Sequence, residues 1–351
     1  MSRKGAAKLR GRLRGWIAGF AAGLAVLCAS ASVQAQTPVR LSLDGRWEGT
    51  AAPFAVAMEK GYFKAEGLDV TIEPSAGPRE ALTRVTVENF EAGIADVNGL
   101  ARLLHDKPET GAIAVMMLHD RPSYAIVGRK SRGISKDLAS LQEKTFGAPQ
   151  ADAAFAMWPV FRMVNAIDES SMKFENVGMA VREPMLAQGE VDAVFGAATT
   201  SYINLKSRGV PVEDIVTLLM SEHGVEAYGS AVVVSKKFAQ EKPEAVKGLL
   251  RAILRGFKDT AKDPEGSVET ILVRNDLARK DVELERLRMA LDQNILTPWV
   301  KENGIGGIDQ ERFAKSLDQM AAALDYKTKP KAEDLFTDAF LPPADERKIA
   351  P

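Results

Sequence analysis

Short apolar runs alternate with helical apolar periodicity along the first third of the chain. The strands that this pattern predicts lie at 39–43, 68–72, 92–97 and 113–118. The helices predicted between them begin at Pro53 and cover 79–87 and 98–105. Repeated strand–helix alternation favours an α/β protein with a parallel sheet and helices on both of its faces.

A second alternating series follows. Its predicted strands lie at 124–127, 145–147, 191–195, 214–219 and 230–235, the last of them returning to the first domain. Its predicted helices cover 136–141 and 152–166, and a polar loop is expected at 199–202. The last third reads as helical, with helices beginning at Pro243 and Pro264 and others at 281–291 and 309–324. The tail from about residue 328 is rich in Pro, Lys, Asp and Glu, which predicts a loosely ordered segment.

The first 35 residues have the pattern of an export signal. Residues 1–15 are basic, 16–28 are apolar and uncharged, and 29–35 are mostly small, ending in Val-Gln-Ala. This pattern predicts a signal peptide cleaved after Ala35. The alternative, a membrane anchor, needs about 20 apolar residues, more than this run contains. Cys28 follows Leu27, which is not small, so a lipid anchor at this cysteine is not expected.

Charge and cysteine content exclude several classes of function. Six of the 46 Lys and Arg residues and none of the 47 Asp and Glu residues lie in 1–35, so the rest of the chain has a formal charge of −7. An acidic body argues against general nucleic-acid binding. Cys28 is the only cysteine, so a mature chain starting at Gln36 would have no disulfide, thiolate metal site or cysteine nucleophile.

The sequence contains no common catalytic motif. The three histidines, His105, His119 and His223, do not form an H-x-x-x-H pair. A G-x-S-x-G elbow, a P-loop and a strand-linked G-x-G-x-x-G are all absent from the sequence. We therefore expect no metal, no cofactor and no enzyme.

Polar and aromatic residues follow several predicted strands, where open α/β sheets bind ligands. Asp44 could accept hydrogen bonds or cap the turn, and Trp47 could stack on a ligand or cover the core. Asp96 and Asp152 could instead cap helices, and the residues before the strand at 230–235 could be solvated. The candidate ligand-binding residues are Asp44, Arg46, Trp47, Ser75, Gly77, Asp96, Asn98, Asp152, Phe155, Thr199, Tyr202, Glu222 and Tyr228.

The segment 61–70, GYFKAEGLDV, resembles the G-[YF]-F-x-x-[EQ]-G-L-[DE]-V signature of ABC-transporter solute-binding proteins for sulfonates, taurine, nitrate and thiamine-precursor pyrimidines. Further similar segments follow in the family's order: EAGIAD at 91–96, DL…KTFG at 137–147, QGEVDA at 188–193, KPEAV at 242–246 and DPE at 263–265. Each match is weak alone, but together they span most of residues 39–275.

The resemblance implies a type II periplasmic-binding-protein fold, in which two α/β lobes are joined by two crossover hinge segments. Lobe one would comprise 38–120 plus 225–351, and lobe two 121–224. The hinges would lie near 119–122 and 221–228. It also implies a periplasmic monomer that binds a small-molecule solute in the interlobe cleft and delivers it to an ABC permease in the inner membrane.

Three readings of the function remain open. The pyrimidine-binding branch is similar in having an acidic residue and a tryptophan after the first strand, here Asp44 and Trp47, although Gly45 and Arg46 separate them in this chain. An aromatic heterocycle as the ligand is slightly favoured by four aromatic residues, Trp47, Phe155, Trp158 and Tyr202. A sulfonate, taurine or nitrate oxyanion is the alternative, with Arg46, Arg121, Thr199 and Thr200 as donors. The third is an exported enzyme on the same fold, although the yeast pyrimidine-forming enzymes of this fold use a cysteine-rich motif that this chain lacks.

Overall fold

The computed structural model describes residues 35–349. Residues from Gln36 onward form one compact unit. The predicted signal peptide and Cys28 lie outside the described residues, apart from Ala35. Within residues 35–349, no helix is both long enough and apolar enough to cross a membrane.

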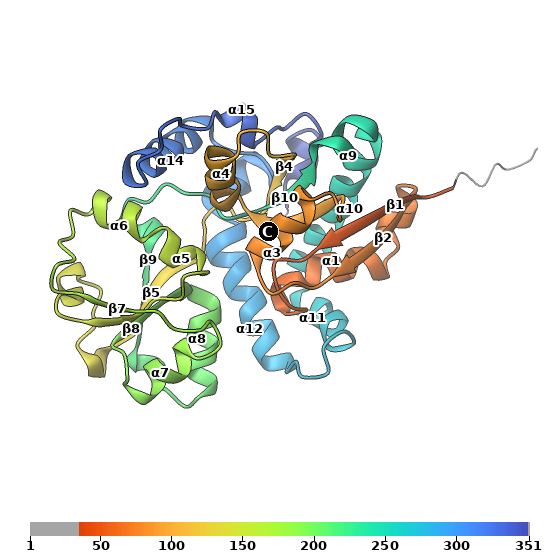
Figure 1. Cartoon of the computed structure of the whole chain (residues 1–351). Helices are drawn as coiled ribbons and strands as arrows, with labels where there is room; N and C mark the ends of the chain where they lie inside the picture. Colours follow the sequence, from red (N-terminus) through yellow and green to blue (C-terminus); the bar gives the residue numbers. More distant parts are fainter. Residues whose placement is uncertain (1–34, 350–351) are drawn as a thin grey trace, which may run out of the picture. The chain divides into compact units, whose positions relative to one another are not determined.

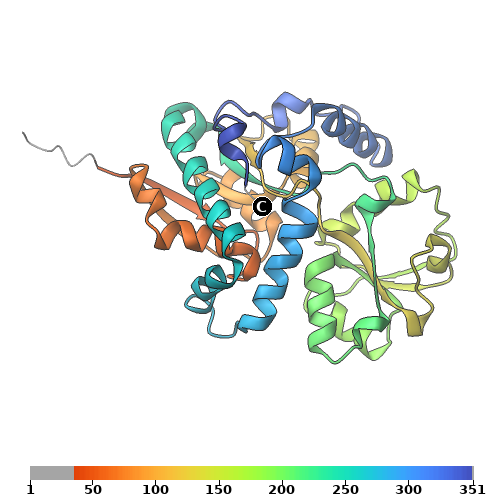
Figure 2. The same ribbon diagram turned by 180° about the vertical axis from the view of Figure 1, so that it is seen from behind.

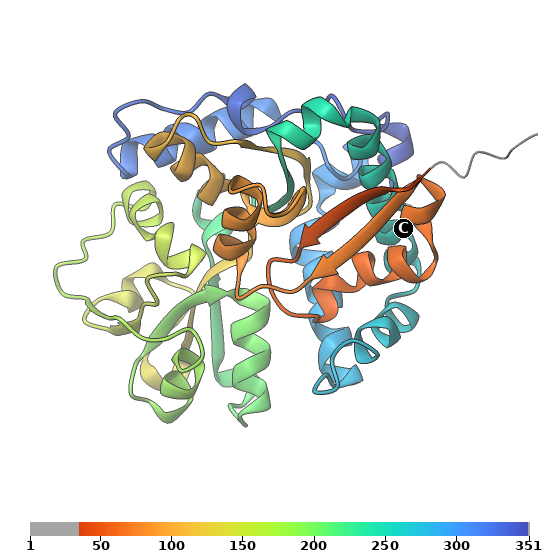
Figure 3. The ribbon, with the colours of Figure 1, turned by 45° about the vertical axis from the view of Figure 1, so that its right-hand side comes forward.

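The first sheet has five strands in the order β2-β1-β3-β10-β4 (Figure 1). Its strands are β1 (Thr37–Ser42), β2 (Leu68–Glu73), β3 (Ala92–Asp96), β4 (Ala112–Met117) and β10 (Ser230–Ser235). Strands β1 and β2 run parallel in a register that pairs Thr37 with Leu68 (Figure 3). Strand β10 runs antiparallel to β3 and β4, so the expectation of a wholly parallel sheet was wrong. The chain enters β10 from a short connection and without the crossover helix that typically joins parallel neighbours.

Several helices pack on or around this sheet. They are α1 (Ala52–Glu59), α2 (Tyr62–Ala65), α3 (Pro78–Thr86), α4 (Val97–Asp106), α9 (Lys236–Glu241), α10 (Pro243–Lys262), α11 (Pro264–Leu272) and α12 (Lys280–Ala290). The long helix α10, clearest from behind (Figure 2), buries the stripe that its periodicity predicts and packs on α1. Phe257 meets Phe54 of α1 edge to face, with ring centroids 5.8 Å apart. Each such buried side chain contributes about 1.5–3 kcal/mol.

The second sheet has the order β7-β6-β8-β5-β9, with β5 antiparallel to both of its neighbours. Its strands are β5 (Tyr124–Arg129), β6 (Thr145–Gly147), β7 (Lys173–Glu175), β8 (Ala193–Ala197) and β9 (Ile215–Leu219). Its helices are α5 (Ala153–Ala156), α6 (Trp158–Val164), α7 (Arg182–Gln188) and α8 (Ala198–Ser207). One face packs on an aromatic cluster in which Trp158 and Phe174 contact Phe146 and Phe195.

Three local predictions for this part of the chain need correction. The helix expected at 152–166 is divided at Met157 into α5 and α6, because Pro159 lacks an N–H and its ring crowds the preceding turn. The polar segment at 199–202 is not a loop but the start of α8. The helix expected at 136–141 is a single turn, Leu138–Leu141, and neither β7 nor α7 was predicted.

The chain passes between the two sheets twice, after β4 and again after β9. The two connections lie side by side. The His119 N–H donates to the Ser230 carbonyl oxygen at 3.0 Å, and the Gly229 N–H donates to that of His119 at 3.0 Å. In the first connection, Asp120 is buried and paired with Arg312 of the C-terminal part at 2.5 Å.

The C-terminal part contains a π-helical turn, Leu291–Ile295, and the helices α13 (Pro298–Asn303), α14 (Gln310–Ala323) and α15 (Ala332–Leu335). The expected loose order after residue 328 was wrong for the described residues. Phe336 pairs with Ala114 beside β4, and Leu335 and Ile349 are buried. The polar composition of this segment gave no indication that these few apolar residues would be buried. Short 3-10 turns lie at Gly49–Ala51, Lys130–Arg132, Val212–Asp214, Met220–His223 and Asp345–Arg347.

Gly49 is expected to be intolerant of substitution because α12 lies against its backbone. Its N–H donates to the Glu283 carboxylate at 2.6 Å, and a Cβ at this position would overlap the Glu283 carbonyl oxygen. Gly49→Ala should therefore lower the free energy of unfolding by about 1–3 kcal/mol. Gly45→Ala, in the same loop but facing open space, should change it by less than about 0.5 kcal/mol. Urea unfolding of both variants tests this, and equal losses would contradict it.

Candidate functional site

A cavity of about 270 Å³ lies where the strand ends of the two sheets meet the connections between them. It is lined by the loops after β1 and β2, by the last residue of β3, by the first turns of α5 and α8, by both connections, and by Ala290 and Asn294 of the C-terminal part. The edge at which strands end and helices begin is the place where open α/β sheets bind ligands. The polar residues lining it are Asp44, Glu48, Thr50, Asp96, His119, Ser123, Tyr124, Asp152, Arg182, Thr199, Thr200, Ser230 and Asn294.

Three carboxylates line the first-sheet side of this cavity. Asp44, in the turn after β1, accepts a hydrogen bond from the Ser230 hydroxyl at 3.0 Å. Burial raises the pKa of Asp44 to about 6, even though the Ser230 hydrogen bond lowers it. Burial also raises the pKa of Glu48, although Arg286 at 3.5 Å opposes this change. Each carboxylate has lost part of its water shell without gaining full compensation from the protein.

Asp96 is the third carboxylate and has a structural role as well. It caps α4 by accepting from the Asn98 and Gly99 N–H groups at 2.8 and 2.9 Å. It also accepts a hydrogen bond from the Tyr124 hydroxyl, across the first connection. Burial raises the pKa of Asp96, while these hydrogen bonds lower it. Asp96 therefore joins the end of β3 to the start of β5.

Arg182 provides the positive charge on the second-sheet side. Its side chain is only 4% exposed. It pairs with Asp152 and, through Nε at 2.7 Å, with Glu183, and it donates to the Phe195 carbonyl oxygen at 3.1 Å. Burial lowers the pKa of Arg182, but the two carboxylates outweigh burial and leave the pKa raised. The guanidinium therefore stays charged between two acids.

The glycine on the neighbouring strand makes room for this guanidinium. A Cβ at Gly196 of β8 would lie 2.9 Å from the Arg182 Cζ and 2.6 Å from the Ser201 hydroxyl oxygen. That hydroxyl donates to Glu183 at 2.9 Å. Residues of α7, β8 and α8 thus hold Arg182 in one position at the edge of the cavity.

The cavity has an excess of negative charge. Among the described residues that line it, four are acidic (Asp44, Glu48, Asp96 and Asp152) and Arg182 alone is basic. His119 adds no charge near neutral pH, because burial lowers its pKa to about 4. Such a lining attracts groups that donate hydrogen bonds or carry positive charge, and it repels free anions. The described residues contain no group of three or more His, Cys, Asp or Glu side chains that could hold a metal ion.

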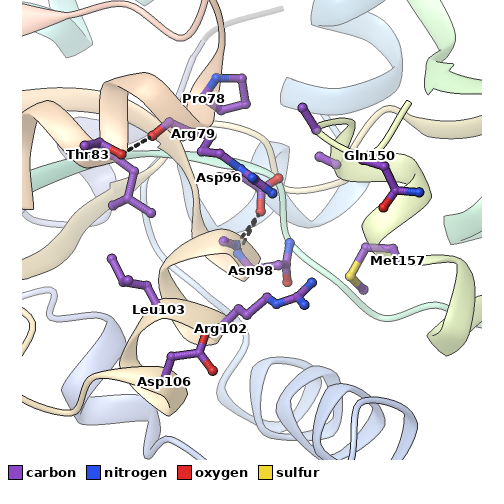
Figure 4. Close-up of a pocket in the computed structure, with 14 residues that line it drawn as sticks. Pro78, Arg79, Thr83, Asp96, Asn98, Arg102, Leu103, Asp106, Gln150 and Met157 are labelled. Carbon is purple, nitrogen blue, oxygen red and sulfur yellow. Dashed lines mark hydrogen bonds between the residues drawn. The ribbon is translucent and has the colours of Figure 1, made fainter. Parts of the chain in front are cut away.

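A second, larger cavity of about 570 Å³ adjoins the first (Figure 4). The two share Pro78, Asp96, Ala151 and Ala153 in their linings. The second cavity lies between α3, α4 and the loop before α5. Its volume falls in the range of small-molecule sites.

Six of the thirteen predicted site residues line these cavities. Asp44, Gly77, Asp96, Asp152 and Thr199 line the first, while Asn98 lines the second. Both helix-capping alternatives also hold, because Asp96 caps α4 and Asp152 caps α5. A residue can therefore cap a helix and face the cavity at the same time.

The predicted aromatic residues lie elsewhere. Trp47 packs on the core of the first sheet, with the Arg274 guanidinium 5.4 Å from its ring centroid. Phe155 packs against Phe195 with centroids 5.1 Å apart, and Tyr228 is fully buried under Arg312. The structure thus gives these rings packing roles in place of the stacking expected from Trp47 and Phe155.

The remaining predicted residues also lie outside both cavities. Arg46 is exposed, and the Ser75 hydroxyl donates to the Leu43 carbonyl oxygen at 2.7 Å, which shapes the loop. Tyr202 and Glu222 line a separate pocket that also includes Lys136 and Glu285.

Sequence reasoning missed Glu48, Tyr124 and Arg182. Glu48 lies in the same turn as Asp44, so its position after the first strand was a usable signal. Arg182 gave no such signal, because its partner Asp152 is distant in sequence and α7 was not predicted. Tyr124 stands at the start of a predicted strand, where an apolar role is the ordinary expectation.

Two mixed sheets with helices and two connections define the periplasmic-binding-protein fold. The fold matches that of the periplasmic aliphatic sulphonate binding protein SsuA from Escherichia coli, with a TM-score of 0.66, 12% identity and coverage of 89% of this chain and 97% of that one. Residues 49–267 match the family described as NMT1/THI5 like. The chain therefore belongs to the NMT1/THI5-like family.

Characterised relatives include binding proteins and enzymes. The riboflavin-binding protein RibY of Chloroflexus aurantiacus is 24% identical over 83% of this chain and 82% of its own length. The formylaminopyrimidine-binding protein of Halalkalibacterium halodurans is 24% identical over 80% and 84%. The 4-amino-5-hydroxymethyl-2-methylpyrimidine phosphate synthase of Aspergillus parasiticus is 24% identical over 74% and 80%.

Proposed function

We propose that this chain is the substrate-binding component of an ABC importer and that its ligand is a small heterocycle rich in N–H or amino groups, such as a thiamine-precursor-like pyrimidine. The acidic lining of the first cavity is the observation that carries the proposal. RibY and the formylaminopyrimidine-binding protein, whose names specify nitrogen heterocycles, support the same class of ligand.

The two sides of the cavity suit the two kinds of polar group on such a ring. Asp44 and Glu48 accept hydrogen bonds from amino or ring N–H groups. Arg182 and the Thr199 and Thr200 hydroxyls donate to ring nitrogens or carbonyl oxygens on the opposite edge. A ligand held between both sides would favour closure of the two lobes, 38–120 plus 225–351 and 121–224, about the connections near 119–122 and 221–228.

An oxyanion ligand fits the lining less well. A sulfonate or nitrate would face four carboxylates and one arginine that two of the surrounding acids already neutralise. Of the four donors considered for an oxyanion, Thr199 and Thr200 line the cavity, but the two charged ones, Arg46 and Arg121, are exposed and do not line it. Repulsion by uncompensated carboxylates inside a partly dry site is costly.

The mature chain, beginning at Gln36, acts as a periplasmic monomer after removal of residues 1–35. It delivers the intact solute to an inner-membrane permease. No cofactor is required, because binding and release change no covalent bond.

Binding without turnover distinguishes a transport protein from an enzyme of the same family. We expect the chain from Gln36 onward to bind 4-amino-5-hydroxymethyl-2-methylpyrimidine, the unphosphorylated form of the compound in the synthases' name, and to release it with its mass unchanged. Native mass spectrometry of the complex, followed by analysis of the released compound after overnight incubation, makes the comparison. A product that accumulates with wild-type protein and not with Asp44→Asn would overturn the proposal in favour of an enzyme.

A further inference from the structure

Protein donors already occupy two of the four carboxylates that line the first cavity. Asp96 and Asp152 each cap a helix, accepting backbone N–H groups through Oδ1 (Figure 4 shows Asp96). The second oxygen of each, Oδ2, binds a side chain. The Tyr124 hydroxyl of β5 donates to Asp96, and the Arg182 guanidinium of α7 donates to Asp152. Three donors thus occupy each carboxylate, which has about four acceptor positions.

The other two carboxylates, Asp44 and Glu48, are more open. Within residues 35–349, Asp44 has one side-chain donor, the Ser230 hydroxyl at 3.0 Å. Glu48 makes no side-chain cap to the 3-10 turn that follows it, and it lies 3.5 Å from Arg286. Both therefore keep acceptor positions for a ligand. Asp44 and Glu48 belong to the same loop after β1, so the open acceptors lie on one side of the cavity.

The Tyr124 hydroxyl is fixed in its direction. It accepts a hydrogen bond from Nδ2 of Asn98 at 2.9 Å, and the same amide nitrogen donates to the Tyr228 carbonyl oxygen at 2.6 Å. Because Asn98 supplies the proton of that bond, the proton of the hydroxyl points to Asp96. Burial raises the pKa of Tyr124 well above its ordinary value, and the charge of Asp96 raises it further, so the hydroxyl stays protonated at neutral pH.

Tyr124 differs from Arg182 because it carries no charge. It occupies Asp96 without neutralising it, whereas Arg182 pairs with Asp152 as a cation. The ring of Tyr124 packs in the apolar core and is only 6% exposed, so a phenylalanine would keep this packing. Loss of the hydroxyl alone would therefore leave a carboxylate oxygen of Asp96 free in the cavity that both residues line.

We propose that Tyr124 is a positioning residue that determines the selectivity of the site: its hydroxyl withholds Asp96 from the ligand and leaves Asp44 and Glu48 as the acceptors. This inference rests on the proposed function and deepens it, because it restricts the ligand class to molecules whose N–H donors lie on the edge that faces the loop after β1. A further amino group on another edge finds Asp96 already occupied.

Matched probes that differ by one amino group test this role. The parent probe is 4-amino-5-hydroxymethyl-2-methylpyrimidine. Two analogues carry one further amino group, either in place of the 2-methyl group or at ring carbon 6. The measured quantity is the ratio of the affinity for each analogue to the affinity for the parent, obtained by calorimetric titration of the chain from Gln36 onward.

Tyr124→Phe should raise this ratio about tenfold or more for at least one analogue, because one further hydrogen bond to a charged acceptor becomes possible. Adding Asp96→Asn to Tyr124→Phe should return the ratio to its wild-type value, since the free carboxylate is then absent. Tyr202→Phe makes the same chemical change in a separate pocket and should leave the ratio unchanged. A purely structural role of Tyr124 would weaken all three probes alike and would not move the ratio.

A single substitution provides an independent check. Asp96→Asn alone should weaken the parent probe by less than about threefold, whereas Asp44→Asn should weaken it by about 100-fold, because only Asp44 serves the ligand.

The outcomes separate this role from the proposed function. If the parent probe binds but the ratio does not rise in Tyr124→Phe, or if the rise survives Asp96→Asn, the role of Tyr124 is overturned and the proposed function stands. Equal losses in Asp96→Asn and Asp44→Asn would overturn it as well. If the wild type binds none of the three probes, the proposed ligand class fails and the role of Tyr124 fails with it.

Discussion

Replacing Asp44 with Asn is expected to weaken solute binding strongly and to make the unliganded protein more stable at neutral pH. Among residues 35–349, Asp44 receives its one hydrogen bond from another side chain from the Ser230 hydroxyl. An asparagine keeps the shape and this contact but removes the charge that attracts an amino group. We expect a loss of affinity of about 100-fold, which corresponds to about 3 kcal/mol, the upper range for a hydrogen bond to a charged group.

The stability change follows from the pKa of Asp44, which burial raises from 3.8 to about 6 in the folded protein. An acid with a raised folded pKa lowers stability once it ionises, so the penalty is absent below about pH 4, grows between pH 4 and 6, and is complete above pH 6. Because the side chain faces the cavity and its water, we expect Asp44→Asn to gain about 1–3 kcal/mol at pH 7.5 and almost nothing at pH 4.

Two measurements check this prediction. Urea unfolding at both pH values gives the stability difference, and titration with the pyrimidine probe gives the affinity, which in the wild type should rise as pH increases through about 6. Asp69→Asn, at an exposed carboxylate of β2, is the control and should change neither quantity. Destabilisation by Asp44→Asn at pH 7.5, or unchanged binding, would contradict the role given to Asp44.

Replacing Arg182 with Met is expected to have the largest effect on stability. The change leaves Asp152 and Glu183 facing each other without their shared cation, and their side chains are only 7% and 3% exposed. Removing one partner of a buried ion pair costs about 3–5 kcal/mol, because an uncompensated charge stays behind. Thermal and urea unfolding measure the loss directly.

A matched surface pair provides the control. Arg279 pairs with Asp281 at 2.7 Å, but these side chains are 70% and 68% exposed, so Arg279→Met should cost less than about 1 kcal/mol. Adding Asp152→Asn and Glu183→Gln to Arg182→Met removes the stranded charges and should recover much of the loss. Equal effects of Arg182→Met and Arg279→Met would show that the buried cluster does not stabilise the fold.

The pattern of apolar positions predicted most elements of this fold. A helix or strand that buries one face has apolar residues at the repeat of that element, and this repeat can be read from the sequence. The stripe of α10 and the runs of β1 to β4 are examples. The direction of β10 could not be predicted in this way, since a strand reads alike in either direction and its pairing depends on where the chain returns. The tail after residue 328 was misjudged because three apolar contacts anchor a mostly polar segment.

Some residues of the candidate site could likewise be predicted from the sequence, and others could not. Asp44, Gly77 and Asp96 could be predicted because they follow strands whose ends meet at one edge of a sheet. Trp47 and Phe155 could not be assigned from the sequence, because an aromatic side chain suits a core as well as a ligand, and in the structure both pack on apolar residues. Arg182 depends on a partner 30 residues away, a proximity that only the folded chain reveals.

A paired titration of the chain from Gln36 onward at pH 7.5 tests the central claim most directly. One ligand is 4-amino-5-hydroxymethyl-2-methylpyrimidine and the other is a simple alkanesulfonate, each followed by calorimetry at the same ionic strength. The acidic lining of the first cavity predicts saturable binding of the pyrimidine and no heat of binding for the sulfonate. Saturable binding of the sulfonate, with no response to the pyrimidine, would contradict the ligand class proposed for this protein.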